Sequence, residues 1–257
     1  MKILFMILVI NKLILLSNCS NKWSAKFIKK AARITDQSWK IYSAPGSQFS
    51  KFWCLNKCRD NIYCAYVEHG NAKCIFYSEY AKDSLISSND AYLYEKISYK
   101  IEIQKCSQSD NYWSLSQKKC LSCLSGFTKY AGWPYACYQL LSGKYRFASA
   151  KLECQNKGTS LITPKSRREL DFIEETFGIS GIWVYSSVSS ATEVYKWSDG
   201  MRVGGFMPGQ PSHSAGNMAT LSEPFLGVLE GGLNDYPPMM HLKNGIIGIS
   251  SKNLFIK

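Results

Sequence analysis

Histidine is scarce in this sequence, with three among 257 residues, and His69, His213 and His241 stand far apart. No Gly-x-Ser-x-Gly segment is present to carry a serine nucleophile, and no glycine-rich loop of the phosphate-binding kind occurs. The CxxC spacing from Cys120 to Cys123 has neither a second CxxC nor a histidine pair to complete a zinc site. The sequence therefore predicts a protein that is not an enzyme.

Long runs of like charge are also absent, although the formal net charge is +12. The lysines are scattered, and no block of five or six basic residues indicates a dedicated nucleic-acid site. A basic surface attracts polyanions without specificity, so weak binding of acidic polysaccharide is expected, and no nucleic-acid partner is predicted.

Apolar runs long enough to span a membrane are absent after residue 19. The first 20 residues instead have the features of a secretory signal peptide: Lys2, an apolar run from Ile3 to Ile10 that resumes at Leu13–Leu16, and small residues before a cut. Leu16-Ser-Asn-Cys19 loosely resembles a bacterial lipoprotein cleavage site, which remains the alternative. We expect a secreted, extracellular chain with no membrane span in its mature form.

Cysteine, in contrast, is plentiful, with ten residues. Cysteines behind a secretory leader indicate an oxidising compartment and disulfide bonds. Removal of Cys19 with the leader leaves an odd number, so one cysteine is expected to lack a partner within the chain.

The first cysteine cluster lies in residues 21–98. Cys54 and Cys58 are one helical turn apart, and two segments rich in strand formers, Ala65–Val67 and Cys74–Tyr77, flank a turn at His69-Gly-Asn71. Ala91–Tyr94 is expected to be the last strand. This arrangement resembles a PAN/apple domain, a module that binds proteins or carbohydrates. The resemblance implies nested disulfides, Cys54 with Cys74 and Cys58 with Cys64; a generic four-cysteine secreted domain is the alternative.

Residues 99–122 are polar and without periodicity, so we predict a linker. Within it, Cys106 and Cys120 are expected to close a small loop.

Residues 123–257 form the last region. Helices are predicted over Tyr145–Lys157, ended by Gly158, and over Ser166–Ile173, where Ser166 and Glu169 have the spacing of a capping box. Strands are predicted at Ser160–Ile162, at Ile182–Val184 and from Tyr195 into a turn that ends the segment Trp197-Ser-Asp-Gly200.

This region resembles a C-type lectin-like domain, on the strength of Trp197-Ser-Asp-Gly200, the triplet Gln210-Pro211-Ser212 and Leu233-Asn-Asp235. The resemblance implies a hairpin closed by Cys123 and Cys137, and two helices with antiparallel sheets and a long loop region. The predicted fold class is thus α+β, in two small disulfide-rich modules.

Sugar binding in this family depends on a calcium ion held by side-chain oxygen atoms, with the proline of the triplet in the cis form. The resemblance makes Gln210, Ser212, Asn234 and Asp235 the candidates for sugar and calcium binding, with Gln210, Asn234 and Asp235 as the metal ligands. One carboxylate remains where the family has three, because Ser212 replaces an acid or amide and the loop from His213 to Met218 contains no acid. Calcium is therefore expected to bind at about millimolar concentration or not at all.

The family's cysteine pattern is also reduced. Met218 and Pro238 stand where the resemblance places one disulfide, and Gly248 stands where it places the partner of Cys154. Cys154 is thus predicted to be unpaired within the chain. It is buried and inert, pairs with another chain, or pairs with Cys19 if that residue survives processing.

The sequence predicts a secreted carbohydrate-binding protein with a weak or absent calcium site, whose partners are glycans or glycoproteins. The alternative is a calcium-independent extracellular protein-interaction module that has lost sugar binding.

Overall fold

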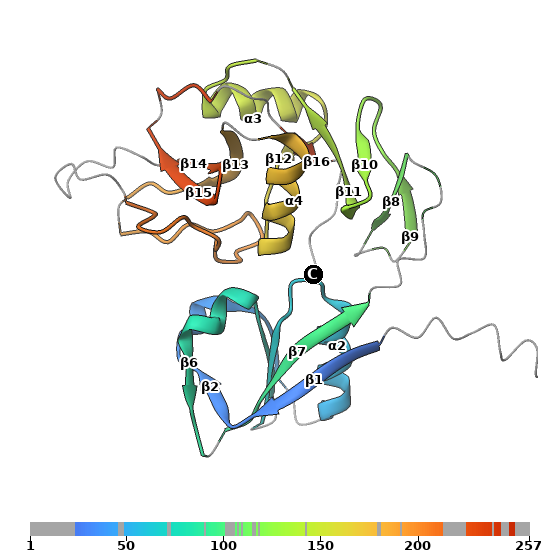
Figure 1. Cartoon of the computed structure of the whole chain (residues 1–257), viewed down its shortest axis with the longest axis vertical. Helices are drawn as coiled ribbons and strands as arrows, with labels where there is room; N and C mark the ends of the chain where they lie inside the picture. Colours follow the sequence, from blue (N-terminus) through green and yellow to red (C-terminus); the bar gives the residue numbers. More distant parts are fainter. Residues whose placement is uncertain are drawn as a thin grey trace, which may run out of the picture.

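The computed structural model describes residues 24–45, 49–70, 73–89, 91–100, 106, 108, 110–114, 117, 119–141, 143–178, 181–190, 192–212, 225–237, 239–242 and 247–249. Its strands fall into two groups, because no sheet combines strands from before residue 101 with strands from after it. We call residues 24–100 the N-terminal unit and residues 106–249 the C-terminal unit. Figure 1 shows them one above the other.

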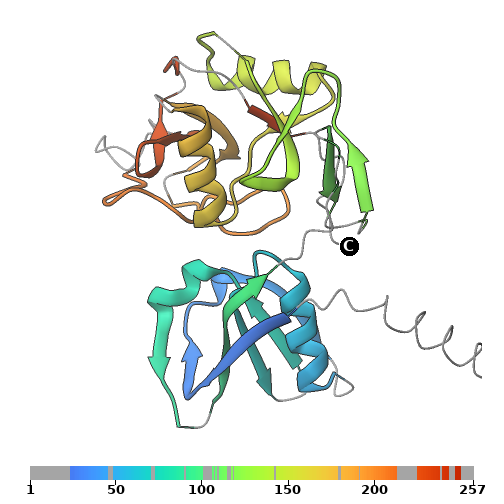
Figure 2. The ribbon, with the colours of Figure 1, turned by 45° about the vertical axis from the view of Figure 1, so that its right-hand side comes forward.

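The N-terminal unit is a helix packed on an antiparallel sheet. Its five-stranded sheet has the order β1-β7-β4-β5-β3, and α2 packs against β1, β4 and β7 (Figure 2). A two-stranded sheet, β2 with β6, and two 3-10 helices complete the unit. The bounds are β1 Ser24–Lys30, β2 Ala32–Ile34, η1 Gln37–Trp39, β3 Lys40–Pro45, α2 Lys51–Asp60, β4 Tyr66–Gly70, β5 Lys73–Tyr77, η2 Glu79–Ser84, β6 Leu85–Ser87 and β7 Leu93–Lys100.

Helix α2 is held at both ends by specific contacts. The Ser50 hydroxyl caps its first turn by accepting a hydrogen bond from the Trp53 N–H at 3.2 Å. At the other end, the Lys96 ammonium donates to the carbonyl oxygens of Cys58 and Asn61. The one-turn spacing of Cys54 and Cys58 buries both side chains against the sheet. The predicted helix is confirmed, with its cysteines on the core side.

Among the described residues, eight cysteines form four disulfides, in the pairs that the resemblances and the cysteine spacing imply. Cys54–Cys74 joins α2 to β5, and Cys58–Cys64 closes the turn after the helix. The other two are Cys106–Cys120 and Cys123–Cys137. Among the described cysteines Cys154 alone is free; it is buried, and burial raises the pKa of its thiol to about 12.

The predicted linker over 99–122 is more ordered than its polar sequence indicates. Strand β7 continues to Lys100, and β8 (Asn111–Ser114) pairs with β9 (Lys119–Ser122) as an antiparallel hairpin. Tyr112 on β8 is 4% exposed because it packs against Phe127 and Cys137. The expectation of an irregular spacer is thereby corrected for the described strands β8 and β9, which one buried aromatic ring and the Cys106–Cys120 bond hold although the sequence lacks hydrophobic alternation.

The C-terminal unit combines two helices with two sheets. The sheet orders are β10-β11-β16-β12 and β13-β14-β15, and helices α3 and α4 lie beside them (Figure 1). The bounds are β10 Thr128–Tyr130, β11 Trp133–Leu140, α3 Phe147–Asn156, β12 Ser160–Leu161, α4 Arg167–Phe177, β13 Ile182–Ser187, β14 Phe225–Leu229, β15 Gly232–Tyr236 and β16 Ile247–Ile249.

Both predicted helices of this unit are confirmed. Helix α3 is followed by Gly158 at φ +70°, a conformation that favours glycine. Helix α4 begins after Ser166, whose hydroxyl accepts from the Glu169 N–H at 3.2 Å. The Glu169 carboxylate returns to the Lys165 N–H at 3.0 Å, one residue earlier than in a standard capping box.

The segment from Tyr195 is predicted as a strand that runs into a turn at Gly200; the turn is present, but no regular strand precedes it. It forms a tight turn with one isolated bridge between Lys196 and Arg202, and the Trp197 N–H donates to the Met201 carbonyl at 2.9 Å. Tyr195 and Trp197 are each 2% exposed, so this turn is anchored by two buried rings.

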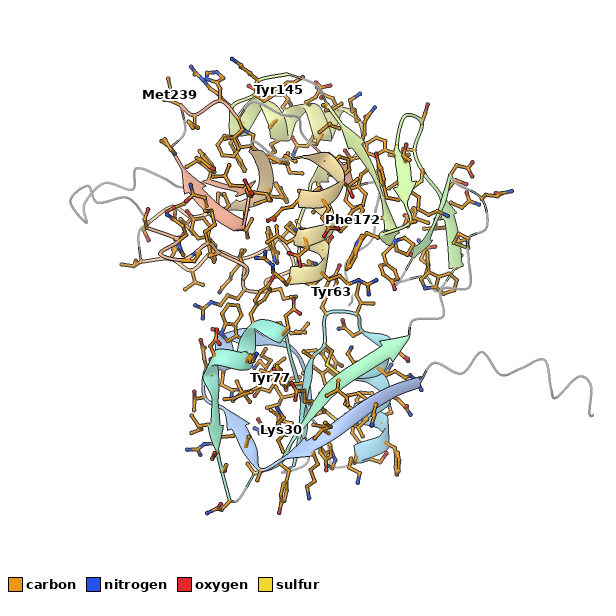
Figure 3. The ribbon with its side chains drawn as sticks, viewed as in Figure 1. Lys30, Tyr63, Tyr77, Tyr145, Phe172 and Met239 are labelled. Carbon is orange, nitrogen blue, oxygen red and sulfur yellow. A yellow bond between two sulfur atoms is a disulfide. The ribbon has the colours of Figure 1, made fainter. Side chains whose placement is uncertain are left out.

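The two units share part of one core. Ile62 is buried in the cluster that also contains Leu170 and Ile173 of α4, and Tyr63 packs against the same cluster. Figure 3 shows Tyr63 at the boundary between the units. Across the described residues, no helix has the length and apolar character needed to cross a membrane.

Candidate functional site

The candidate site begins with strand β15, which pairs with β14 through a turn at Glu230-Gly231. Residue 235 lies near the end of β15 opposite Leu226. Although aspartate is a charged residue, Asp235 is 1% exposed. A buried carboxylate requires hydrogen-bond donors, so the segment that packs over Asp235 decides its chemistry.

That segment is the chain from Val203 to Ser212, which runs along β15. The Leu233 N–H donates to the Gly205 carbonyl at 2.9 Å, and the Met207 N–H donates to the Leu233 carbonyl at 3.0 Å. A turn follows, closed by the Gln210 N–H on the Met207 carbonyl at 3.0 Å. Proline at its second position and Gly209 at φ +80° at its third are typical of a type II turn.

The turn places the triplet against Asp235. The Gln210–Pro211 peptide bond is cis, as the resemblance implies. The Gln210 Oε1 atom accepts from the Ser212 N–H at 2.9 Å, and the same N–H lies 3.3 Å from Asp235 Oδ1. The Ser212 hydroxyl also lies 3.4 Å from Asp235 Oδ1. Ser212 and Asp235 are 23 positions apart in the sequence, yet they converge with Gln210 on one point.

Asn234, the fourth candidate, is beside Asp235 on β15 and is partly exposed. Successive residues of a strand direct their side chains to opposite faces, so the convergence involves Asp235 and not Asn234. The loop candidates His213 and Asn217, and the positions Met218 and Pro238, lie outside the described residues.

The described residues do not fit a calcium ion. Calcium takes six to eight oxygen ligands, several of them carboxylates. Here Asp235 supplies one buried carboxylate, and its Oδ1 atom faces the N–H and the hydroxyl of Ser212. The Oε1 atom of Gln210 faces the same N–H. Among the residues that the structure describes, no group of three or more His, Cys, Asp and Glu side chains could hold a metal ion.

Contacts from the N-terminal unit reach this part of the C-terminal unit, and sequence reasoning missed them. Arg202 donates to Asp36 Oδ2 at 2.8 Å, and its guanidinium lies 4.1 Å from the centre of the Trp39 ring. The Arg167 N–H donates to the Glu79 carboxylate. No local pattern marks these residues, because the partners are 88 to 166 positions apart.

A cleft of about 650 Å³ lies between the units and reaches the candidate site. Trp39 and Tyr80 line it from the N-terminal unit, and Phe206, Gln210 and Pro211 from the C-terminal unit. Burial raises the pKa of Tyr80, so its hydroxyl stays protonated at neutral pH.

No sequence model of a protein family matches the chain, and no curated protein matches it. Among solved structures, the chain is similar to the cow C-type carbohydrate-recognition domain of CD23, crystallised in the presence of a GlcNAc2Man3 oligosaccharide. The identity is 20% and the TM-score 0.43, over 52% of this chain and 99% of that one. The mouse scavenger receptor C-type lectin carbohydrate-recognition domain is 26% identical, with a TM-score of 0.41 over 52% and 99%. A calcium-independent type II antifreeze protein is 20% identical, with a TM-score of 0.40 over 51% and 95%. These similarities cover about half of the chain and fall in its C-terminal half.

Proposed function

We propose that this chain is a secreted carbohydrate-binding protein with a C-type lectin-like C-terminal unit, and that it binds glycans or glycoproteins through Gln210, Ser212 and Asp235. Asn234, the fourth candidate from the sequence, is left out of this proposed site because it is on the other face of β15. The observation that supports this is the convergence of Gln210, Ser212 and Asp235, which brings an amide, a hydroxyl and a carboxylate within hydrogen-bond distance. This combination offers both acceptors and donors, which a sugar with several hydroxyl groups requires.

Calcium contributes weakly or not at all to this proposed binding. Asp235 is the one carboxylate among the described residues of the site, and its Oδ1 atom already accepts from Ser212, so little negative charge is available to hold a divalent cation. A sugar hydroxyl needs one acceptor position, and a carboxylate has about four. We therefore expect sugar binding that survives removal of calcium.

The proposal extends to the rest of the chain. In this proposal residues 21–98 are a PAN/apple-like module behind a signal peptide at 1–20, residues 99–122 connect the modules, and residues 123–257 are the lectin-like module. Support comes from the nested bonds Cys54–Cys74 and Cys58–Cys64 on a helix and sheet.

Calorimetric titration of the full secreted chain with galactose and with mannose, in calcium and in chelator, tests the proposal. We expect binding of one sugar with equal affinity in both buffers. Ser212→Ala removes the hydroxyl and should weaken that binding about fivefold to tenfold, the effect of one lost neutral hydrogen bond. Ser122→Ala, an exposed serine on β9, is the matched control. Binding abolished by chelator, or unaffected by Ser212→Ala, contradicts the proposal.

The second candidate is a calcium-independent protein-interaction module. The exposed side chains of Met239 and Met240, 64% and 42% exposed just beyond β15, favour it, because methionines adapt to varied apolar surfaces. A partner protein whose binding is lost in Met239→Ser/Met240→Ser but kept in Ser212→Ala, with no sugar bound by the wild type, supports this candidate instead.

A further inference from the structure

The cleft is lined by aromatic rings from both units and by polar groups between them. Trp39 and Tyr80 lie with their ring centres 5.8 Å apart, and Phe206 faces the same space. Its volume of about 650 Å³ is within the range of about 300–1,000 Å³ that small-molecule sites occupy. Gln210 and Pro211 line the cleft, and Gln210 also belongs to the candidate sugar site, so the cleft and the site are adjacent.

The walls of the cleft are held in place by contacts between the units. Arg202 binds Asp36 and stacks on Trp39, and Glu79 accepts from the Arg167 N–H. The Tyr80 ring lies directly over Gly204, where an added Cβ atom would collide with it. The ring can approach this closely only because residue 204 has no side chain.

Tyr80 also offers an unused hydrogen-bonding group. Its hydroxyl is buried and, among the described residues, has no hydrogen-bond partner. It lies next to Gly205, 2.9 Å from the position of a Cβ built there, and Gly205 also lines the cleft. A buried hydroxyl without a partner is costly, so a ligand group that bonds to it gains affinity.

The charges of the cleft favour a neutral ligand over an anion. Arg167 and Arg202 line it, but so do Asp83 and Glu193. Both guanidinium groups are already paired, Arg202 with Asp36 and Arg167 with Asp171. An acidic ligand would therefore gain little, whereas a neutral ring with apolar faces and hydroxyl edges matches aromatic walls and a free hydroxyl.

We propose that this cleft binds the second and following sugar rings of a neutral oligosaccharide whose terminal ring occupies the Gln210–Ser212–Asp235 site, so that the N-terminal unit contributes directly to recognition. The inference rests on the proposed function. It predicts that the ligand is an oligosaccharide and that a single sugar uses only part of the binding surface.

The test compares the monosaccharides galactose and mannose with galactobiose and mannotriose, titrated into the full chain and its variants. We expect the oligosaccharide of the preferred sugar to bind about tenfold or more tightly than its monosaccharide. Tyr80→Phe keeps the ring over Gly204 and removes the hydroxyl, so it should reduce this gain about fivefold while leaving monosaccharide affinity unchanged.

Val194→Trp is the second variant. Val194 lines the cleft and is 48% exposed, so tryptophan there fills the space without disturbing the core. Its matched control is Ile28→Trp, at 44% exposure on β1. We expect Val194→Trp to abolish the gain and Ile28→Trp to preserve it.

Three outcomes overturn the inference. Equal affinity of the wild type for monosaccharide and oligosaccharide removes the cleft subsite but leaves the proposed function intact. If Tyr80→Phe or Val194→Trp lowers the affinity for monosaccharide and oligosaccharide equally, the cleft subsite is likewise excluded and the proposed function stands. No binding of any of the four sugars overturns the inference and contradicts the proposed function.

Discussion

Glu169 is a buried carboxyl group whose ionisation state affects stability at neutral pH. Burial raises its pKa to about 7, although the Lys165 N–H and ammonium oppose the shift. Between the ordinary value near 4.5 and about 7, the folded chain holds a proton that the unfolded chain releases. The protonated Glu169 therefore contributes to the free energy of unfolding in full below pH 4.5, and this contribution of about 3 kcal/mol is lost as pH rises through 7.

Glu169→Gln removes this titration. We expect the variant to gain stability relative to wild type as pH rises, because only the wild type loses a bound proton. Urea unfolding of both proteins at pH 4.5, 6 and 8 measures this difference in free energy of unfolding. Tyr138 faces the same region, but burial raises its pKa, so it stays protonated over this range. A difference that is constant with pH would mean that Glu169 does not titrate there.

Ser212 explains at the residue scale why calcium fits poorly. In Ser212→Asp, a second carboxylate would stand within about 4 Å of Asp235, and two like charges repel unless a proton or cation lies between them. We expect the variant to unfold at a lower temperature than wild type in chelator and to recover in about 10 mM calcium. Ser212→Asn, which adds no charge, is the control. A calcium response in wild type equal to that of Ser212→Asp would show that the native site already binds the ion.

At the scale of elements, the helices were predictable because their signals are local. Ser166 and Glu169 are three positions apart, and the predicted capping contact forms between them. Ser166→Ala should cost about 1 kcal/mol in free energy of unfolding, while Ser198→Ala, at an exposed turn, should change it by less than about 0.5 kcal/mol. Equal effects of the two substitutions would exclude a capping role for Ser166.

The hairpin β8–β9 was not predictable by the same reasoning. Residues 99–122 show no hydrophobic alternation in the sequence, and the hairpin at 111–122 is instead packed through Tyr112 on Phe127, which directly precedes β10. In the Tyr195–Gly200 segment the turn was predictable but the absence of a regular strand before it was not, because its strand-forming residues are buried as anchors of the turn, with the Trp197 N–H bonded to the Met201 carbonyl. Whether a single aromatic ring is buried depends on tertiary packing, which the hydrophobic periodicity of the sequence does not predict.

At the scale of the whole molecule, the sequence predicted two modules but not their contact. The triplet and Asp235 carry a recognisable order along the chain, so their meeting could be expected. Trp39, Tyr80 and Arg202 carry no such pattern, and their contacts join segments more than 80 positions apart. The contact between the units thus had to come from the structure.

The close approach of Tyr80 to Gly204 makes the docking of the units testable. Gly204→Ala should displace Tyr80 and increase the radius of gyration in small-angle X-ray scattering, because a Cβ atom there collides with the ring. Gly70→Ala is the matched control, since no atom lies within 4 Å of the position its Cβ would take. An unchanged radius in Gly204→Ala would mean that docking does not depend on this contact.

The most direct test of the central claim is glycan-array binding of the purified full chain, with and without chelator, alongside Ser212→Ala. The convergence of Gln210, Ser212 and Asp235 predicts a defined set of bound glycans that is unchanged by chelator and is weakened in the variant. An array without bound glycan, or binding that disappears on chelation, would contradict the account.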